Sequence, residues 1–187
     1  MTDDKRQQIL TATLDLIHEN GLQSTPMSAI AQNAGVAMGT IYHHFASKEE
    51  LVNALYKNLL AQMGTYVLGN YTSEAPVHTR LTQLWTDTLQ FIIRHPKEFL
   101  FGDQYAYSPY IDPTAKKDDS GWSETMAQAL AEGQAQGVIK QMDPEILIHV
   151  VMGLISSLAK GHIAGKYTLT DEMVETAVNL CWDAVKR

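Results

Sequence analysis

Apolar residues recur at the spacing of an α-helix along almost the whole chain, and this period constrains the fold more than any other feature. Leu10, Leu14 and Ile17 follow an i, i+4, i+7 pattern, and Leu51 and Leu55 begin a second run of the same kind. The sequence contains no convincing alternation of apolar and polar residues, which a half-buried strand would require. It therefore predicts an all-α protein.

Capping and breaking residues divide this pattern into segments. Thr25 is expected to cap a short helix that Gly35 ends. Ser47 and Glu50 have the spacing of a capping box at the start of a long helix, and Asp143 is expected to cap a later one. The expected helices cover about residues 4–20, 26–34, 36–45, 48–71, 81–95, 96–107, 122–137, 143–164 and 170–186. Two prolines and a charge cluster predict an exposed loop at 108–121.

The charge balance restricts how such a protein could bind nucleic acid. The chain of 187 residues has a formal net charge of −7. Its first 58 residues hold fewer basic than acidic side chains: Lys5, Arg6, Lys48 and Lys57 against Asp3, Asp4, Asp15, Glu19, Glu49 and Glu50. A protein that coats nucleic acid by bulk charge is therefore excluded, and any DNA contact must depend on local geometry.

The stretch AGVAMGTIYHHF at residues 34–45 carries the residue types of a binding site. A phosphate-binding loop is disfavoured, because the stretch lacks the lysine and the glycine spacing of that motif. A shared metal site is also disfavoured, because His43 and His44 are adjacent and helical neighbours point about 100° apart. The rest of the chain offers no catalytic constellation. We expect a protein that is not an enzyme and that has no cofactor and no metal.

Placed on a helix, residues 37–45 separate into two faces. Ile41 and Phe45 share the apolar face. The opposite face is polar and has little side-chain bulk near its N-terminal end, with Gly39, Thr40 and His43 on it and Tyr42 and His44 at its sides. With the preceding short helix this gives the plan of a helix-turn-helix, whose second helix enters the major groove of DNA. The pattern alone fits two core helices joined by a glycine turn nearly as well.

Resemblance to a known family favours the first interpretation. Residues 5–58 resemble the DNA-binding domain of the tetracycline-repressor (TetR) family of bacterial transcriptional regulators. The resemblance rests on Gly21, Thr25, Ile30, Ala31, Ala34, Gly35, Val36, Gly39, Thr40, Ile41, Tyr42, His43, Phe45, Lys48, Glu49 and Leu51. It implies a three-helix helix-turn-helix domain at residues 1–47 and a helical ligand-binding and dimerisation domain at 48–187.

The resemblance also assigns roles within the first domain. It implies that base edges of the DNA face Ala37, Met38, Thr40 and His43, and that Gly39 lies where the helix approaches the DNA closely. It also implies that phosphates face Thr25, Ser28, Tyr42, His44 and Lys48. Ala37 departs from the family pattern, where Ser is frequent, so the helix loses a capping hydroxyl worth about 1 kcal/mol. Ser28 stands where a longer basic residue is often found.

Two features of the second domain suggest a dimer and a pocket. Residues 146–158 are apolar almost all round, and the last helix has an apolar stripe of Val174, Ala177, Val178, Cys181 and Val185; we expect a homodimer interface there. Large amphipathic side chains in the middle of the chain suggest a site for a small-molecule inducer. Its candidate residues are Trp85, Phe91, Phe101, Tyr105, Tyr107, Trp122, Met126, His149 and Met152.

The sequence thus predicts a ligand-responsive regulator that binds double-stranded DNA and acts as a repressor. The alternative is a helical small-molecule-binding protein or enzyme whose N-terminal module is structural. We expect a cytoplasmic location, because the single cysteine, Cys181, suits a reducing compartment. We expect no membrane partner, because the apolar run at 146–158 is shorter than the roughly 20 residues that a bilayer requires.

Overall fold

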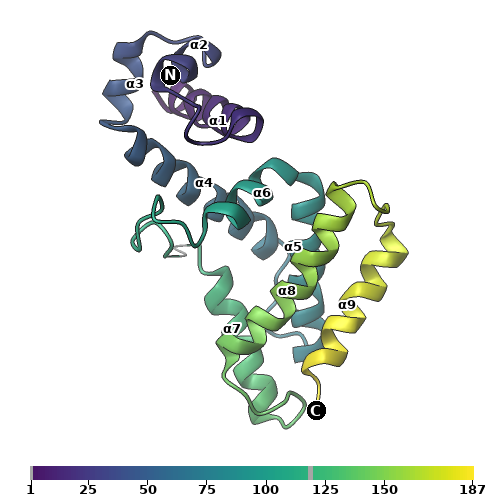
Figure 1. Cartoon of the computed structure of the whole chain (residues 1–187). Coiled ribbons are helices and arrows are strands. Elements are labelled where there is room, and N and C mark those ends of the chain that lie inside the picture. The colour runs from purple at the N-terminus through teal and green to yellow at the C-terminus, as the bar shows by residue number, and fades with distance from the viewer. Residues whose placement is uncertain (1, 118–119) are drawn as a thin grey trace. The chain divides into compact units, whose positions relative to one another are not determined.

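The chain folds into α-helices, in agreement with the expected class (Figure 1). The computed structural model describes residues 2–117 and 120–187, and these residues form nine helices. They are α1 (Thr2–Asn20), α2 (Met27–Asn33), α3 (Met38–His44), α4 (Lys48–Leu68), α5 (Val77–Arg94), α6 (Pro96–Tyr105), α7 (Trp122–Ala135), α8 (Pro144–Ile163) and α9 (Asp171–Val185). Within these ranges the only β pairing is an isolated bridge between Ile139 and Lys186.

Two of the expected caps are present. Ser47 accepts a hydrogen bond from the backbone N–H of Glu50 at 3.1 Å, and the Glu50 carboxylate accepts one from Ala46 N–H at 2.7 Å. Asp143 caps α8 by accepting from the N–H of Glu145 at 2.9 Å. Side-chain acceptors therefore satisfy backbone donors at the start of α4 and of α8.

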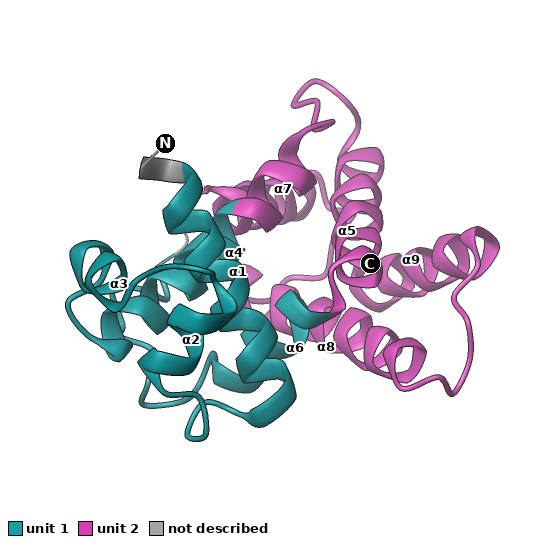
Figure 2. Ribbon diagram, turned by 90° about the horizontal axis from the view of Figure 1, so that it is seen from above, with its two compact units in different colours: residues 1–61, 97–119 teal, residues 62–96, 120–187 magenta. Residues whose placement is uncertain are grey.

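The helices form two compact units, coloured separately in Figure 2. The first consists of residues 1–61 and 97–119, and the second of residues 62–96 and 120–187. The first unit is larger than the domain expected at residues 1–47, because it also contains the first part of α4 and nearly all of α6. A single boundary at residue 47 could not include residues 97–119, which follow it by 50 residues in the sequence.

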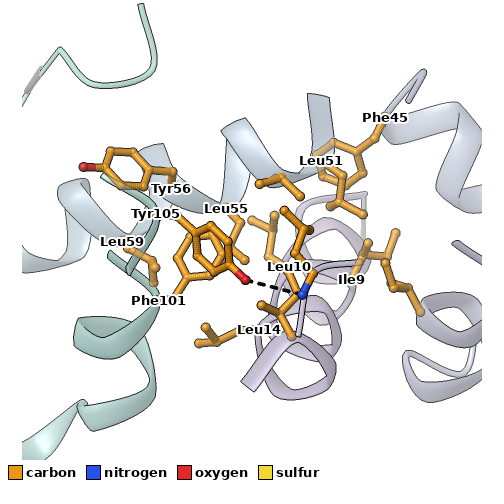
Figure 3. Close-up of a cluster of buried hydrophobic side chains, with 14 of the residues drawn as sticks. Ile9, Leu10, Leu14, Phe45, Leu51, Leu55, Tyr56, Leu59, Phe101 and Tyr105 are labelled. Carbon is orange, nitrogen blue, oxygen red and sulfur yellow. Dashed lines mark hydrogen bonds between the residues drawn. The ribbon is translucent and has the colours of Figure 1, made fainter. Parts of the chain in front are cut away.

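The core of the first unit explains this division (Figure 3). Phe101 and Tyr105 of α6 are buried in the same cluster as Leu10 and Leu14 of α1 and Leu55 of α4. Burial of side chains of this size contributes about 1.5–3 kcal/mol each. Helix α6 is thus an integral part of the unit that carries α2 and α3.

Polar contacts extend the same association to the loop after α6. The Tyr105 hydroxyl accepts from the backbone N–H of Leu22, at 3.4 Å, in the turn that precedes α2. Asn53 of α4 donates to the carbonyl of Tyr110 at 3.2 Å and accepts from the N–H of Asp112 at 2.8 Å. The α6 segment and its loop therefore brace both the turn before α2 and the start of α4.

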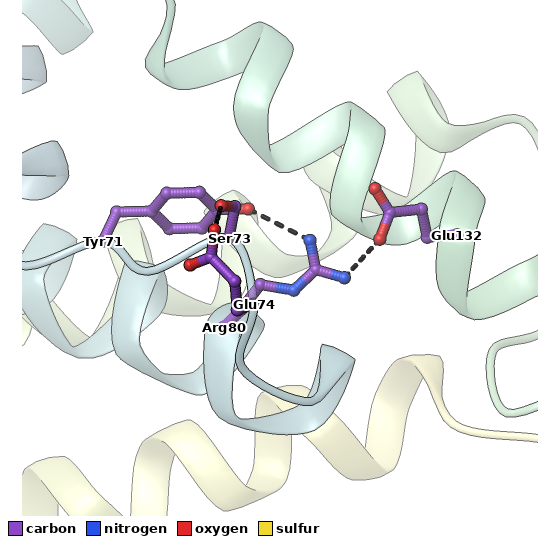
Figure 4. A network of polar contacts seen from close by, with 5 residues as sticks. All are labelled: Tyr71, Ser73, Glu74, Arg80 and Glu132. Carbon is purple, nitrogen blue, oxygen red and sulfur yellow. Dashed lines mark hydrogen bonds and ion pairs between the residues drawn. The ribbon is translucent and has the colours of Figure 1, made fainter.

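In the second unit α5 is the central helix, packed against α7, α8 and α9. Its N-terminal end holds a polar network centred on the buried Arg80 (Figure 4). The Arg80 guanidinium, 6% exposed, donates to the Tyr71 hydroxyl at 3.3 Å and forms an ion pair with Glu132 of α7. This ion pair raises the pKa of Arg80 and lowers that of Glu132. The network fixes α7 and the loop after α4 to the start of α5.

The outer surface of α8 and α9 differs from the expected interface. The stripe predicted on α9, from Val174 to Val185, is buried in the core of its own unit, because α5 and α8 cover that side of the helix. The large apolar side chains that α8 and α9 leave exposed are Ile146, Val150, Leu154, Met173 and Leu180.

Helix α8 is also longer than the apolar run that predicts it. With 20 residues, it is long and apolar enough to cross a membrane by length and composition alone. This differs from the expectation drawn from residues 146–158, because the helix continues through Ala159, Gly161 and Ile163. Leu147, Val151, Ile155, Ala159 and Gly161 are buried within the unit, so one face of the helix packs against protein.

Candidate nucleic-acid interface

The turn between α2 and α3 has a defined hydrogen-bonding pattern. After the last turn of α2, Gly35 adopts φ +64° and donates to the carbonyl of Gln32 at 3.2 Å. Val36 N–H donates to the carbonyl of Ala31 at 3.0 Å. These two bonds make a Schellman motif, which needs a left-handed residue that glycine supplies without strain. The turn predicted at Gly35 is confirmed, and it sets the direction of α3.

Helix α3 presents the two faces that the sequence predicts. Ile41 is fully buried and Phe45, at its C-cap, is 1% exposed. On the other side, Ala37, Met38, Gly39 and His43 are exposed, and Tyr42 keeps 53% of its surface. Thr40 and His44 are half-buried at the margin. The first unit therefore holds α3 by one face and leaves the other free for contact.

Gly39 is not required by the packing of the chain itself. It has no positive φ, and a Cβ built on it meets nothing within 4 Å. Glycine in a helix costs about 0.5–1 kcal/mol relative to alanine. The open space at Gly39 fits a position that a second surface must approach closely.

The N-terminus of α3 has no side-chain cap. Ala37 occupies the N-cap position in extended geometry, with φ −70° and ψ 149°, and it has no hydroxyl to offer. This geometry is the one that capping serines adopt. The departure from the family pattern at Ala37 therefore removes a hydrogen bond without disturbing the backbone.

Thr25 does not have the role that the sequence suggests. It is 1% exposed, and its hydroxyl donates to the carbonyl of Gly21 at 2.9 Å and contacts that of Leu16 at 3.3 Å. The N-cap of α2 is Pro26, without a side-chain cap. The capping prediction was wrong because Pro26 takes the N-cap position and the Thr25 hydroxyl turns back to carbonyls at the end of α1 and in the following turn. A buried side chain used in this way is not available to a phosphate, whereas Ser28 is exposed on α2.

Lys48 is also engaged within the unit. Its Nζ donates to the carbonyl of Leu22 at 2.5 Å, and partial burial lowers its pKa. The side chain thus ties the start of α4 to the turn before α2. An ammonium has three donors, so two hydrogens remain for an external acceptor.

The structure brings one further basic residue to α3 that sequence reasoning missed. The Arg6 guanidinium of α1 lies 5.3 Å from the centroid of the Phe45 ring, in cation–π geometry. His43 and His44 directly precede Phe45 in the sequence. Their two rings pack edge to face, with centroids 5.4 Å apart. The only signal for Arg6 was the basic pair Lys5–Arg6 near the chain start. A positive charge thus lies beside α3 although the unit as a whole is acidic.

The residues predicted for a ligand pocket do not come together as one group. Phe101 and Tyr105 belong to the core of the first unit, and Tyr107 is 86% exposed. His149 is exposed, with Nδ1 against the carbonyl of Glu145 at 2.8 Å. Met152 is half-buried on α8. The remaining four are buried in the second unit: Trp85, Phe91, Trp122 and Met126.

An exposed recognition helix held by a preceding helix and a glycine turn defines a helix-turn-helix DNA-binding protein. Residues 9–55 match the family model of bacterial regulatory proteins of the tetR family, and residues 76–186 match that of the tetracyclin repressor-like C-terminal domain. The chain therefore belongs to the TetR family. Members of this family are transcriptional regulators and not enzymes, and they bind DNA operators and small-molecule ligands.

Individual relatives agree with this assignment. An uncharacterised HTH-type transcriptional regulator of Haemophilus influenzae is 24% identical over 98% of this chain and 97% of its own length. The transcriptional repressor KstR2 of Mycobacterium tuberculosis is 28% identical over 70% of this chain and 69% of its own. A TetR family transcription regulator of Marinobacter aquaeolei VT8 has the same fold, with a TM-score of 0.90, 24% identity and coverage of 98% and 96% of the two chains.

Proposed function

We propose that the protein is a homodimeric repressor that binds a palindromic operator and is released from it by a small-molecule inducer. The observation that carries this proposal is the exposed face of α3, on which Gly39 leaves open space that no intramolecular contact uses. A symmetric dimer places two copies of α3 on two half-sites, so the operator mirrors the protein's two-fold axis.

Within each half-site the contacts divide into two kinds. Ala37, Met38, Thr40 and His43 face base edges, and the apolar pair at the start of the helix suits thymine methyl groups. Ser28, Tyr42, His44, Lys48 and Arg6 face phosphates and set the register. Because few cations are available, we expect a shallower dependence of affinity on salt than a basic regulator would have.

The dimer is proposed to form through α8 and α9. On α8 the exposed residues Ile146, Val150 and Leu154 follow helical spacing, and Gly153 beside them has open space around its Cα. Met173 and Leu180 add to this surface from α9. Exposed apolar side chains at helical spacing are typical of an interface. Its burial in a dimer also accounts for the apolar character of α8 without a membrane.

The inducer is proposed to bind in the second unit, where Phe91, Trp122 and Met126 are buried on α5 and α7. Release of the operator requires that the inducer prefers the conformation that does not bind DNA. We propose a cytoplasmic location, because the operator DNA lies there and because reducing conditions suit a free thiol such as Cys181.

The test is an electrophoretic mobility shift with DNA from upstream of the protein's own gene. We expect a specific complex that weakens with salt and that Tyr42→Ala weakens about 10-fold, because a phosphate contact is lost in each half-site. Substitution of an exposed residue away from α3, such as Glu175→Gln, is the matched control. Failure of the wild-type protein to form any salt-sensitive specific complex would contradict the proposal.

A further inference from the structure

A buried carboxylate lies in the interior of the second unit. Asp87, near the middle of α5, is 5% exposed. Removing a carboxylate from water is costly unless it is paired or hydrogen-bonded. The cost of burying this carboxylate is therefore offset either by neighbouring side chains or by a ligand that binds to it.

The described neighbours compensate Asp87 only in part. Its Oδ2 accepts one hydrogen bond, at 2.9 Å, from the neutral side chain of Gln83. Within residues 2–117 and 120–187, no cation forms an ion pair with it. Arg80, seven residues earlier on the same side of α5, is engaged with Glu132 and Tyr71. Burial accordingly raises the pKa of Asp87.

The same side of α5 also carries aromatic rings. Phe91 follows Asp87 by one turn, where side chains are neighbours. The His95 ring stacks on one face of the Phe91 ring, with centroids 4.5 Å apart. The ring of Tyr66 on α4 lies 5.6 Å from that of Phe91, between centroids. Trp122 at the start of α7 is buried, and its indole N–H has no acceptor among the described residues. This side of α5 therefore faces α4 and α7, as the contact between Arg80 and Glu132 also requires.

A carboxylate with one neutral partner, one helical turn from an aromatic ring, is an arrangement that suits an organic cation. We propose that Asp87 is the anchor for a positively charged amino group of the inducer, and that the inducer is an amphiphilic amine. Its ammonium pairs with Asp87 and contacts the face of the Phe91 ring that His95 does not cover. Its apolar part lies among the buried side chains of α5 and α7. This inference rests on the proposed function and specifies the chemistry of its ligand.

Three probes with the same apolar chain and different head groups test the inference: decylamine, 1-decanol and decanoate. Binding to the full-length protein is followed by tryptophan fluorescence, with each probe below its micellar concentration. We expect decylamine to bind at least about 10-fold more tightly than 1-decanol, since a charge-assisted hydrogen bond supplies that difference. Decanoate should bind most weakly.

Asp87→Asn should reduce the preference for decylamine over 1-decanol to less than about 3-fold, whereas the exposed control Glu175→Gln should keep it. If Asp87→Asn does not fold, Phe91→Leu provides the second variant. Its loss of the ring should weaken decylamine binding about 3-fold without a similar effect on 1-decanol.

Equal affinity for the three probes overturns the inference, as does tighter binding of decanoate or an amine preference that survives in Asp87→Asn. Operator binding is measured separately by mobility shift. A wild-type protein that binds its operator but shows no amine preference contradicts only this inference. A wild-type protein that binds no operator contradicts the proposed function, whatever the amine titration shows.

Discussion

Replacement of Gly39 by alanine should stabilise the protein and at the same time weaken its binding to DNA. The added methyl group meets nothing within 4 Å in the chain, and the backbone has no positive φ to resist it. Alanine is favoured over glycine in helices by about 0.5–1 kcal/mol, and the position in the first turn of α3 places the gain near the lower end. A melting temperature about 1–3 °C higher follows for a chain of this length.

The effect on DNA has the opposite sign. A methyl group between α3 and the groove displaces the helix from its base contacts, and the loss of one such set of contacts costs about 1–3 kcal/mol. Two half-sites in a dimer double this cost to about 2–6 kcal/mol, so Kd rises by a factor between about 30 and about 2 × 10⁴. Differential scanning fluorimetry and a mobility shift on the same protein preparation measure the two quantities.

Gly102→Ala is the matched control. Gly102 lies in α6 of the same unit, and a Cβ there also meets nothing within 4 Å. It should give a similar gain in stability with unchanged DNA affinity. If Gly39→Ala binds the operator as tightly as the wild type, no surface approaches that position and α3 does not contact DNA through it. A fall in melting temperature would instead contradict the helical backbone and the open space described at Gly39.

Ala37→Ser should add about 0.5–1 kcal/mol to the free energy of unfolding, measured by urea titration, because its backbone already has N-cap geometry; no gain would mean that α3 starts elsewhere. Val150→Arg should convert the dimer to a monomer in sedimentation velocity, and a dimer that persists would place the interface away from α8. Burial raises the pKa of the Cys181 thiol to about 11, so at pH 8 a disulfide reagent should react at least about 100-fold more slowly with folded than with urea-unfolded protein; equal rates would show an accessible thiol. Because folding raises the pKa of Asp87, the folded state holds that proton more tightly, and the stability it contributes is present in acid and lost as pH rises above about 4. Asn cannot ionise and does not undergo this loss, so the free energy of unfolding of Asp87→Asn, measured by urea titration, should rise relative to that of the wild type between pH 4 and pH 7. A constant difference would mean that Asp87 does not titrate differently in the folded state.

Features set by neighbouring residues could be predicted from the sequence. The two faces of α3 follow from the 100° advance per residue, which separates Ile41 from Tyr42. The glycine turn at Gly35 and the cap at Asp143 depend only on backbone geometry within a few residues. These predictions hold because no distant segment competes with the local preference.

Features that depend on distant segments could not be predicted. Phe101 and Tyr105 are residue types that often line a pocket, but they fill the core beside α1. About 90 residues of sequence separate them from the α1 residues that they contact. The apolar stripe of α9 has the correct period, yet the period does not say whether α5 or a second copy covers it.

The central claim, that two copies of α3 bind a symmetric operator, is tested most directly by sequencing the genomic fragments that the purified protein selects. We expect an enriched inverted repeat whose two arms show the same sequence, and the loss of this enrichment when Gly39→Ala replaces the wild type. Enrichment of a site without two-fold symmetry, or an inverted repeat that Gly39→Ala selects equally well, would contradict the account.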